Sequence, residues 1–175
     1  TRCGRKIHFI LNEGNKLSAT PLHLVTGAAG YSGRAITHLL LGQGVRVRSL
    51  TGHPDRPDPF GGRVETALLD WDDPAALARA MKGATTLYNT YWVRFAHSGS
   101  HHALAVQRSQ LLVEAAAQAG VERIVHTSIT QPNLDSPLPY FSGKARVEQM
   151  VRDSGMSWAI LRPAVFFGGR DVLLN

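Results

Sequence analysis

Cysteine is almost absent from this 175-residue chain, which contains only Cys3. One thiol cannot form an internal disulfide, so a disulfide-stabilised secreted fold is excluded and a cytoplasmic location is expected. Long apolar runs are lacking too, because no stretch approaches the roughly 18–20 residues that a membrane-spanning helix needs. Residues 1–21 lack the apolar centre of a signal peptide, although their Arg, Lys and Ser content leaves import into an organelle open.

A concentrated basic surface is also missing. The formal net charge is +6, but half of it lies in the first 23 residues, where four basic side chains stand against one acidic side chain. The remaining basic residues are scattered and do not alternate with aromatic residues, so nucleic-acid binding is not expected. His97, His101 and His102 follow a predicted strand, but convergent ligands are not evident and no metal site is predicted.

From residue 22 onward, short apolar segments alternate with segments of helical periodicity. Asp73-Pro74 is a helix start, with a capping carboxylate and a proline at the first helical position. The pattern predicts an α/β fold, a doubly wound, mostly parallel sheet with helices on both faces, which is the Rossmann fold. Residues 1–21 are interpreted as an extension and residues 22–175 as the dinucleotide-binding domain. Strands are predicted at 22–25, 45–50, 64–69, 85–90, 123–128 and 158–161, and helices at 31–41, 73–82, 101–119 and 141–153.

A glycine-rich turn stands between the first predicted strand and the first predicted helix. Gly27 permits a tight turn, Gly30 lets the backbone approach a pyrophosphate, and Gly33 allows close packing of the helix on the strand. Tyr31 and Ser32 begin the helix, whose free N–H groups and partial positive charge suit phosphates. A turn without a ligand is the alternative, but the repeating strand–helix pattern favours binding of NAD or NADP.

The end of the second strand bears on which nucleotide is bound. Sites that prefer NAD place Asp or Glu about 20 residues beyond the glycines, but this chain has no carboxylate there. The nearest cations are His53 and Arg56, and Arg34 follows the third glycine; each is alternatively a solvated surface residue. The pattern favours NADP over NAD. Asp70, at the end of the third strand, is interpreted either as a contact to adenine or as a turn carboxylate.

The spacing Gly-x-x-Gly-x-x-Gly resembles that of the extended and atypical short-chain dehydrogenases/reductases, which include nucleotide-sugar epimerases, dehydratases and NmrA-like proteins. The resemblance covers residues 23–169 and implies a cofactor site that also includes Asn89, Thr90 and Lys144. It also allows a homodimer paired through the helix at 101–119. In two-domain members the substrate-binding part follows the sixth strand, so a C-terminally truncated chain is expected. The further matching segments are Leu68-Leu69-Asp70, Asn89-Thr90, Val125-His126-Thr127-Ser128, Tyr140-Phe141-Ser142-Gly143-Lys144 and Leu161-Arg162-Pro163.

The resemblance implies acid–base chemistry at Tyr140 and Lys144, which share one helix face if both are helical. An ammonium near a phenol lowers the phenol pKa from about 10 toward neutrality. Tyr140 would then exchange a proton with a substrate hydroxyl or carbonyl while the nicotinamide exchanges a hydride. Lys144 would also hold the nicotinamide ribose. The Tyr-x-x-x-Lys spacing also arises by chance, so a purely structural role is the alternative.

One departure from the family pattern lies after the fifth strand. Many members place the catalytic hydroxyl one residue after the first serine, and here that position is Ile129. Ser128 is the expected catalytic hydroxyl and Thr130 the alternative, while Ser128 could also serve only the backbone at the strand end. Tyr91 and Trp92 either border the nicotinamide or cover the sheet edge.

Two functions remain open at this point. One is an NAD(P)-dependent oxidoreductase, epimerase or dehydratase that acts on a small carbonyl, alcohol or nucleotide-sugar-like substrate. The other is a non-catalytic NAD(P)-binding regulator or assembly factor, which Ile129 and the missing carboxylate after the second strand favour.

Overall fold

The computed structural model describes residues 20–93 and 102–166. In this part of the chain a six-stranded sheet runs in the order β3-β2-β1-β4-β5-β6, and every pairing is parallel. The predicted extension over residues 1–21 lies almost entirely outside the described residues and stays a prediction. The strands are β1 Leu22–Thr26, β2 Arg46–Thr51, β3 Val64–Leu68, β4 Ala84–Asn89, β5 Arg123–Thr127 and β6 Ser157–Leu161.

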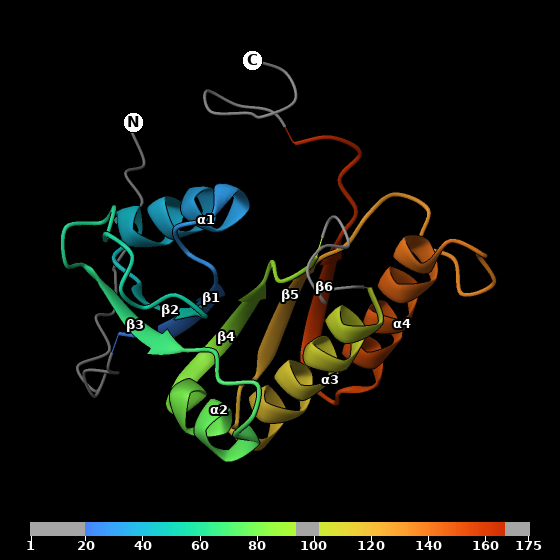
Figure 1. Ribbon diagram of the computed structural model, residues 1–175. Coiled ribbons are helices and arrows are strands. Elements are labelled where there is room, and N and C mark those ends of the chain that lie inside the picture. Colours follow the sequence, from blue (N-terminus) through green and yellow to red (C-terminus); the bar gives the residue numbers. More distant parts are fainter. Residues whose placement is uncertain (1–19, 94–101, 167–175) are drawn as a thin grey trace, which may run out of the picture.

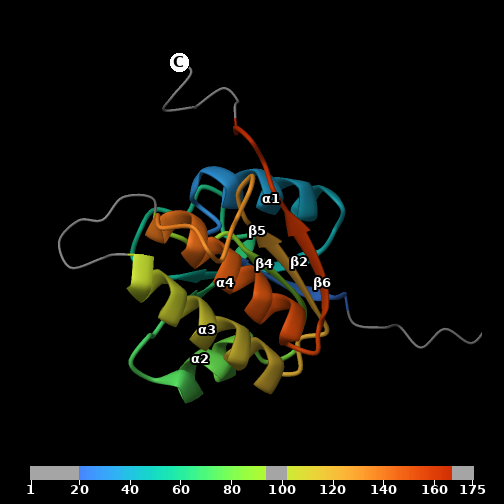
Figure 2. The same cartoon turned by 90° about the vertical axis from the view of Figure 1, so that its right-hand side faces the viewer.

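Helices cover both faces of the sheet, as the sequence predicts (Figures 1 and 2). α1 (Tyr31–Gly42) packs against β1 and β2, whereas α2 (Pro74–Met81), α3 (His102–Gln118) and α4 (Pro139–Asp153) lie side by side on the other face. The fourth helix begins two residues before the predicted start at Phe141, because Pro139 occupies the first helical position. Tyr140 therefore lies in the first turn of α4 and not in front of it.

The core is divided by the sheet into two clusters. Leu24, Leu87 and Ile124 face α2, α3 and α4 and are fully buried. Val25 points to the opposite face and packs with Val47 under α1. Adjacent residues of β1 thus contribute to both clusters, because successive side chains of a strand alternate between faces. Burial on both faces explains why β1 is a short apolar run and not an alternating one.

The carboxyl ends of all six strands meet at one edge of the sheet. Chain connections leave in opposite directions from the neighbours β1 and β4, and a ligand crevice is expected at such a point. The backbone N–H of Thr90 donates to Oγ1 of Thr26 over 2.7 Å, and Oγ1 of Thr90 donates to the carbonyl oxygen of Thr26 over 2.6 Å. These bonds join the segments that follow β1 and β4 at the crevice.

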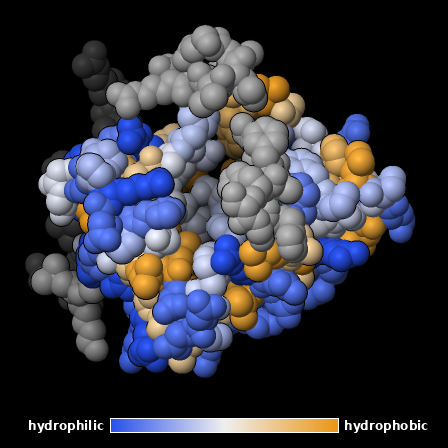
Figure 3. All heavy atoms as spheres, in the orientation of Figure 1, coloured by the Kyte–Doolittle hydropathy of each residue, from blue (hydrophilic) through white to orange (hydrophobic). Residues whose placement is uncertain are grey.

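The surface seen in the orientation of Figure 1 carries small apolar patches among hydrophilic side chains, and it is hollowed between the region of α1 and that of α3 and α4 (Figure 3). Within residues 20–93 and 102–166, no helix has the length and apolar character needed to cross a membrane.

Candidate functional site

The glycine turn after β1 is shaped for close approach of a ligand. Gly27 has a φ of +62°, which an L side chain rarely adopts, and its N–H donates to the carbonyl oxygen of Leu50 over 2.8 Å. The N–H of Gly30 donates back to the Gly27 carbonyl over 2.8 Å. A Cβ at Gly33 would overlap that same carbonyl, so only glycine lets α1 pack this closely on the turn.

The N-terminus of α1 is open toward the turn. Gly30 occupies the N-cap position, no side-chain hydrogen bond caps this helix, and its first turn contains no acidic residue. The first N–H groups of an α-helix have no partner within the helix and carry partial positive charge. The turn and the start of α1, which contains Tyr31 and Ser32, therefore fit the pyrophosphate of a dinucleotide.

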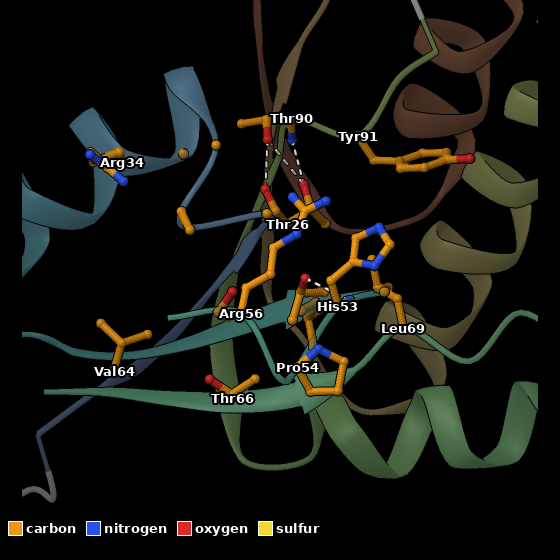
Figure 4. Close-up of a pocket in the computed structure, with 18 of the residues that line it drawn as sticks. Thr26, Arg34, His53, Pro54, Arg56, Val64, Thr66, Leu69, Thr90 and Tyr91 are labelled. Carbon is orange, nitrogen blue, oxygen red and sulfur yellow. Dashed lines mark hydrogen bonds between the residues drawn. The ribbon is translucent and has the colours of Figure 1, made fainter. Parts of the chain in front are cut away.

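A first cleft of about 710 Å³ opens beside this turn. Its walls come from the glycine turn, the end of β2, the loop from β2 to β3 and the segment after β4. Figure 4 shows Arg56 extending into this cleft, with His53 beside it and Arg34 on α1. The sequence named all three as candidate cations for a 2′-phosphate, and all three line the cleft.

The charges along the first cleft suit an anionic ligand. Three arginines line it, and Arg108 from α3 joins the two already named. Asp58 also lines it, but its carboxylate accepts backbone N–H groups of Phe60 over 2.8 Å and of Gly62 over 2.5 Å. These backbone hydrogen bonds, that from Gly62 foremost, hold the pKa of the Asp58 carboxyl below its usual value. Asp58 is thus bound to its own loop, and no arginine of the cleft forms an ion pair with it.

Two residues predicted to contact the cofactor accept hydrogen bonds from nearby backbone. Oδ1 of Asp70 accepts the N–H groups of Asp72 and Asp73 over 3.0 and 3.3 Å, which is the turn role considered from the sequence. Asn89 is fully buried, and its Oδ1 accepts the N–H of Tyr91 over 3.0 Å. Neither residue lines the first cleft, and their contacts to a cofactor stay predictions.

Sequence reasoning missed an aromatic and cationic group in the wall of the first cleft. The ring of Trp71 lies 4.9 Å from that of Tyr91, and the guanidinium carbon of Arg108 lies 5.2 Å from the Trp71 centroid. Trp71 follows β3, Tyr91 follows β4 and Arg108 lies on α3, so only the folded arrangement brings the three residues together. No local motif marks them.

A second cleft of about 510 Å³ adjoins the first, and Tyr31, Ser32, Thr90 and Trp92 line both. It contains the three residues for which the sequence predicts catalysis, Tyr140, Lys144 and Ser128. Its other lining residues are Thr127, Ile129, Thr130, Phe141, Pro163, Ala164, Val165 and Phe166.

Lys144 lines the second cleft and is buried, with 4% of its surface exposed. Its Nζ donates to the carbonyl oxygen of Thr127 over 3.0 Å and lies 4.5 Å from the ring centroid of Trp92. Burial lowers the pKa of the Lys144 ammonium to about 8, against an opposing effect of the Glu148 carboxylate. The ammonium therefore persists at neutral pH and is lost not far above it.

Tyr140 meets the same aromatic group. Its ring lies edge-on to Trp92 at 6.1 Å and to His102 at 5.5 Å between centroids. His102 in turn stacks on Trp92 at 5.9 Å with an angle of 11° between the ring planes. The structure thus brings Tyr140 and Lys144 together around Trp92, the residue that the sequence placed either at the nicotinamide or on the sheet edge.

Ser128 lies in the wall of the second cleft and is 3% exposed, with its backbone N–H donating to the carbonyl oxygen of Leu161 over 2.7 Å. Ile129 and Thr130 also line this cleft. The predicted catalytic role of Ser128 stays a prediction. Of the three histidines considered as ligands, His97 and His101 lie outside the described residues, and within the described part of the chain no cluster of three His, Cys, Asp or Glu residues is placed to hold a metal.

A buried carboxylate on α4 pairs with two arginines near this cleft. The carboxylate of Glu148 is 1% exposed, with Nε of Arg162 at 2.9 Å and Nη2 of Arg152 at 2.8 Å. Burial would raise the pKa of the Glu148 carboxyl, but hydrogen bonds, that of Arg162 foremost, lower it to about 2. Glu148 therefore stays ionised one helical turn beyond Lys144.

Comparison with known proteins agrees with this geometry. Residues 27–171 match the family profile described as NAD(P)H-binding. A Streptomyces griseus reductase, (4-alkanoyl-5-oxo-2,5-dihydrofuran-3-yl)methyl phosphate reductase, is 31% identical over 82% of this chain and 47% of its own. The photosystem II assembly factor Ycf39 of Cyanophora paradoxa is 26% identical over 83% of this chain and 46% of its own.

Solved structures share the fold. A short-chain dehydrogenase/reductase superfamily protein of Agrobacterium tumefaciens, solved with bound NAD, has a TM-score of 0.65 and 26% identity over 81% of this chain and 48% of its own. The chain spans between 15% and 48% of the length of the curated relatives that it matches. The match over residues 27–171, together with the turn and cleft described above, shows that the chain belongs to the NAD(P)H-binding family of Rossmann-fold proteins.

Proposed function

We propose that the protein is an NAD(P)-dependent reductase-type enzyme in which Tyr140 exchanges a proton with the substrate and Lys144 supports it. The observation that carries this proposal is the convergence of Tyr140 and Lys144 on a cleft that adjoins the dinucleotide cleft. The resemblance to short-chain dehydrogenases/reductases implies a small carbonyl compound, an alcohol or a nucleotide-sugar-like molecule as the substrate. The Streptomyces relative, named as a reductase, supports the reaction class.

The cofactor would lie along the first cleft. The turn from Gly27 to Gly33 and the first N–H groups of α1 would hold its pyrophosphate. Arg56 would bind a 2′-phosphate, which favours NADP. Thr90 lines both clefts and Lys144 lines the second. These two residues would lie nearest the nicotinamide end of the cofactor. When bound in reduced form, this cofactor supplies a hydride.

The proton would travel through Tyr140. A positively charged Lys144 lowers the free energy of the Tyr140 phenolate, so the phenol gives up its proton more readily to a developing alkoxide on the substrate. Since burial lowers the pKa of Lys144 to about 8, this support is available at neutral pH and fades as the pH rises past 8. Ser128, which lines the same cleft, would position the substrate oxygen.

Replacement of the phenol tests this proposal. Tyr140→Phe is expected to lower NADPH-dependent turnover of a panel of small aldehydes and ketones by a factor of about 10²–10⁴, since it removes the acid but little volume. The affinity for NADPH, measured from nicotinamide fluorescence, should change less than twofold. Tyr88→Phe makes the same change at a tyrosine that lines neither cleft, and turnover should stay within twofold of the wild type. Wild-type turnover in the Tyr140→Phe variant would show that the proton takes another route.

A non-catalytic cofactor-binding regulator or assembly factor is the second candidate function. Ile129 favours it, because this aliphatic side chain lines the second cleft at the position where many related enzymes carry a hydroxyl. The similarity to an assembly factor in Cyanophora paradoxa is in line with it. Such a protein would bind NADPH without turning over any member of the panel. Pairing of two copies through α3 stays a prediction for either function.

A further inference from the structure

The second cleft has an unusual lining for a site that would hold a polar metabolite. Five aromatic side chains face it, those of Tyr31, Trp92, Tyr140, Phe141 and Phe166. Among its described lining residues, the others carry aliphatic groups or hydroxyls, apart from Lys144, and none has a carboxylate, carboxamide, imidazole or guanidinium group. Those missing groups are the ones that usually bind the hydroxyls of a sugar or the charge of a diphosphate.

The first cleft provides the contrast. It contains three arginines and His53 around the glycine turn, so it has the charges that phosphates need. The two clefts share a border at Thr90 and Trp92, yet the arginines stop at that border. This division separates an anionic ligand on one side from an uncharged ligand on the other.

Lys144 does not provide an exposed anchor for an anion. The residue is 4% exposed, and its ammonium donates to the Thr127 carbonyl and faces the Trp92 ring. Two groups of the protein therefore already interact with this charge. A diphosphate that entered the cleft would lose its hydration without gaining a free cation.

The rim of the second cleft exposes apolar surface. Tyr31 is 44% exposed, Val165 57% and Phe166 40%. The rings of Tyr31 and Phe166 meet edge to face, 6.5 Å apart, across the gap between the start of α1 and the segment after β6. When an apolar ligand covers exposed aromatic surface, the binding free energy improves by about 25 cal/mol for each Å² removed from water. The rim thus continues the aromatic character of the walls.

We propose that the second cleft binds an uncharged, planar carbonyl compound, such as an aryl ketone, and not a nucleotide-sugar. This inference rests on the proposed reductase function for its reaction, in which a ketone becomes an alcohol. The carbonyl carbon gains a hydride, and the two electrons come from NAD(P)H, which is oxidised to NAD(P)⁺. The carbonyl oxygen gains a proton from Tyr140, which then recovers one from water.

Calorimetric binding of two probes tests the assignment without relying on turnover. With NADP⁺ present at saturation, 2-acetylnaphthalene represents the planar ketone and UDP-glucose the nucleotide-sugar. The ketone is expected to bind at least tenfold more tightly than UDP-glucose. Phe166→Ala should weaken ketone binding about three- to tenfold, since one aromatic contact is lost. Leu134→Ala, at a side chain that is 54% exposed and does not line this cleft, should change it less than twofold.

The outcomes separate this inference from the proposed function. If the ketone binds as expected but NADPH does not reduce it, the ligand class stands and the reductase proposal fails. If UDP-glucose binds as tightly as the ketone, if neither probe binds, or if Phe166→Ala behaves like Leu134→Ala, the ligand class is wrong whether or not the protein has reductase activity.

Discussion

The ammonium nitrogen of Lys144 lies 4.5 Å from the ring centroid of Trp92, within the range of a cation–π interaction. The contact depends on the glycine that precedes the lysine. A Cβ at Gly143 would approach Cη2 of Trp92 to 3.1 Å and Cγ2 of Val106 to 3.2 Å. Because Gly143 has no side chain, it leaves space for the indole ring of Trp92, whose face contacts the Lys144 ammonium. Trp92 is positioned to hold Lys144 beside Tyr140.

This contact predicts an effect of Trp92 on turnover. In a largely desolvated site a cation–π interaction contributes about 1–2 kcal/mol, so Trp92→Leu should lower turnover about tenfold, whereas Trp92→Phe, which keeps an aromatic face, should lower it less than threefold. Trp158→Leu is the matched control, because Trp158 faces Arg152 at 5.7 Å and lines neither cleft. Equal losses in the Leu and Phe variants of Trp92 would contradict a role of the ring face.

The glycine turn predicts loss of cofactor binding in Gly30→Glu. The added carboxylate would stand at the open N-terminus of α1 and repel the pyrophosphate both sterically and by charge. Nicotinamide fluorescence should show binding of NADPH by the wild type and none by the variant. Gly42→Glu adds the same side chain at the far end of α1, where a Cβ meets nothing within 4 Å, and should leave binding intact. Binding by a folded Gly30→Glu protein would refute the pyrophosphate assignment.

Arg56 predicts the choice between the two nucleotides. A hydrogen bond to a charged group contributes about 1.5–3 kcal/mol, so loss of the guanidinium in Arg56→Gln should weaken NADPH binding about 10- to 100-fold. NADH lacks the 2′-phosphate, and its dissociation constant should stay within twofold. Arg79→Gln removes an arginine that lines neither cleft and serves as the control. An equal loss of affinity for NADPH and NADH would show that Arg56 contacts a part of the cofactor that both nucleotides share, and not the 2′-phosphate.

The buried Lys144 predicts a specific pH dependence of stability. Burial lowers its pKa from 10.5 to about 8, so between these values the folded state holds fewer protons than the unfolded state. The unfavourable contribution of the buried ammonium is complete below pH 8 and is relieved as the pH rises toward 10.5. The free energy of unfolding of the wild type should therefore gain about 3 kcal/mol relative to Lys144→Met over this window.

Urea unfolding of both proteins at intervals from pH 7.5 to 10.5 measures this difference. Because the other titrating groups are common to both proteins, they largely cancel in the comparison. For Lys82→Met, at an exposed position, the free energy of unfolding should change with pH in parallel with that of the wild type. If the Lys144→Met curve also runs parallel, the ammonium is not held in a dehydrated site.

Much of the fold follows from local patterns. Within the described residues, the six strands and four helices agree with the predicted ones to within a few residues, because their periodicity, capping residues and glycine stops act within single segments. The start of α4 differs from the prediction. The sequence predicts a start at Phe141, but Leu138 is the N-cap residue and Pro139 is the first residue of the helix. Local patterns could not choose between the two readings of Asp70, since a carboxylate after a strand suits both a turn and a ligand.

The glycine turn, the parallel sheet and the NAD(P)H-binding family were readable from the chain alone, because each depends on residues that are neighbours in sequence or recur with a fixed period. The aromatic second cleft was not. Tyr31, Trp92, Tyr140 and Phe166 come from four separate segments, and the strand order together with the packing of α3 on α4 brings them to one edge of the sheet. Side-chain burial and a lysine pKa near 8 exist only after that packing, because both arise from the removal of water by residues distant in sequence.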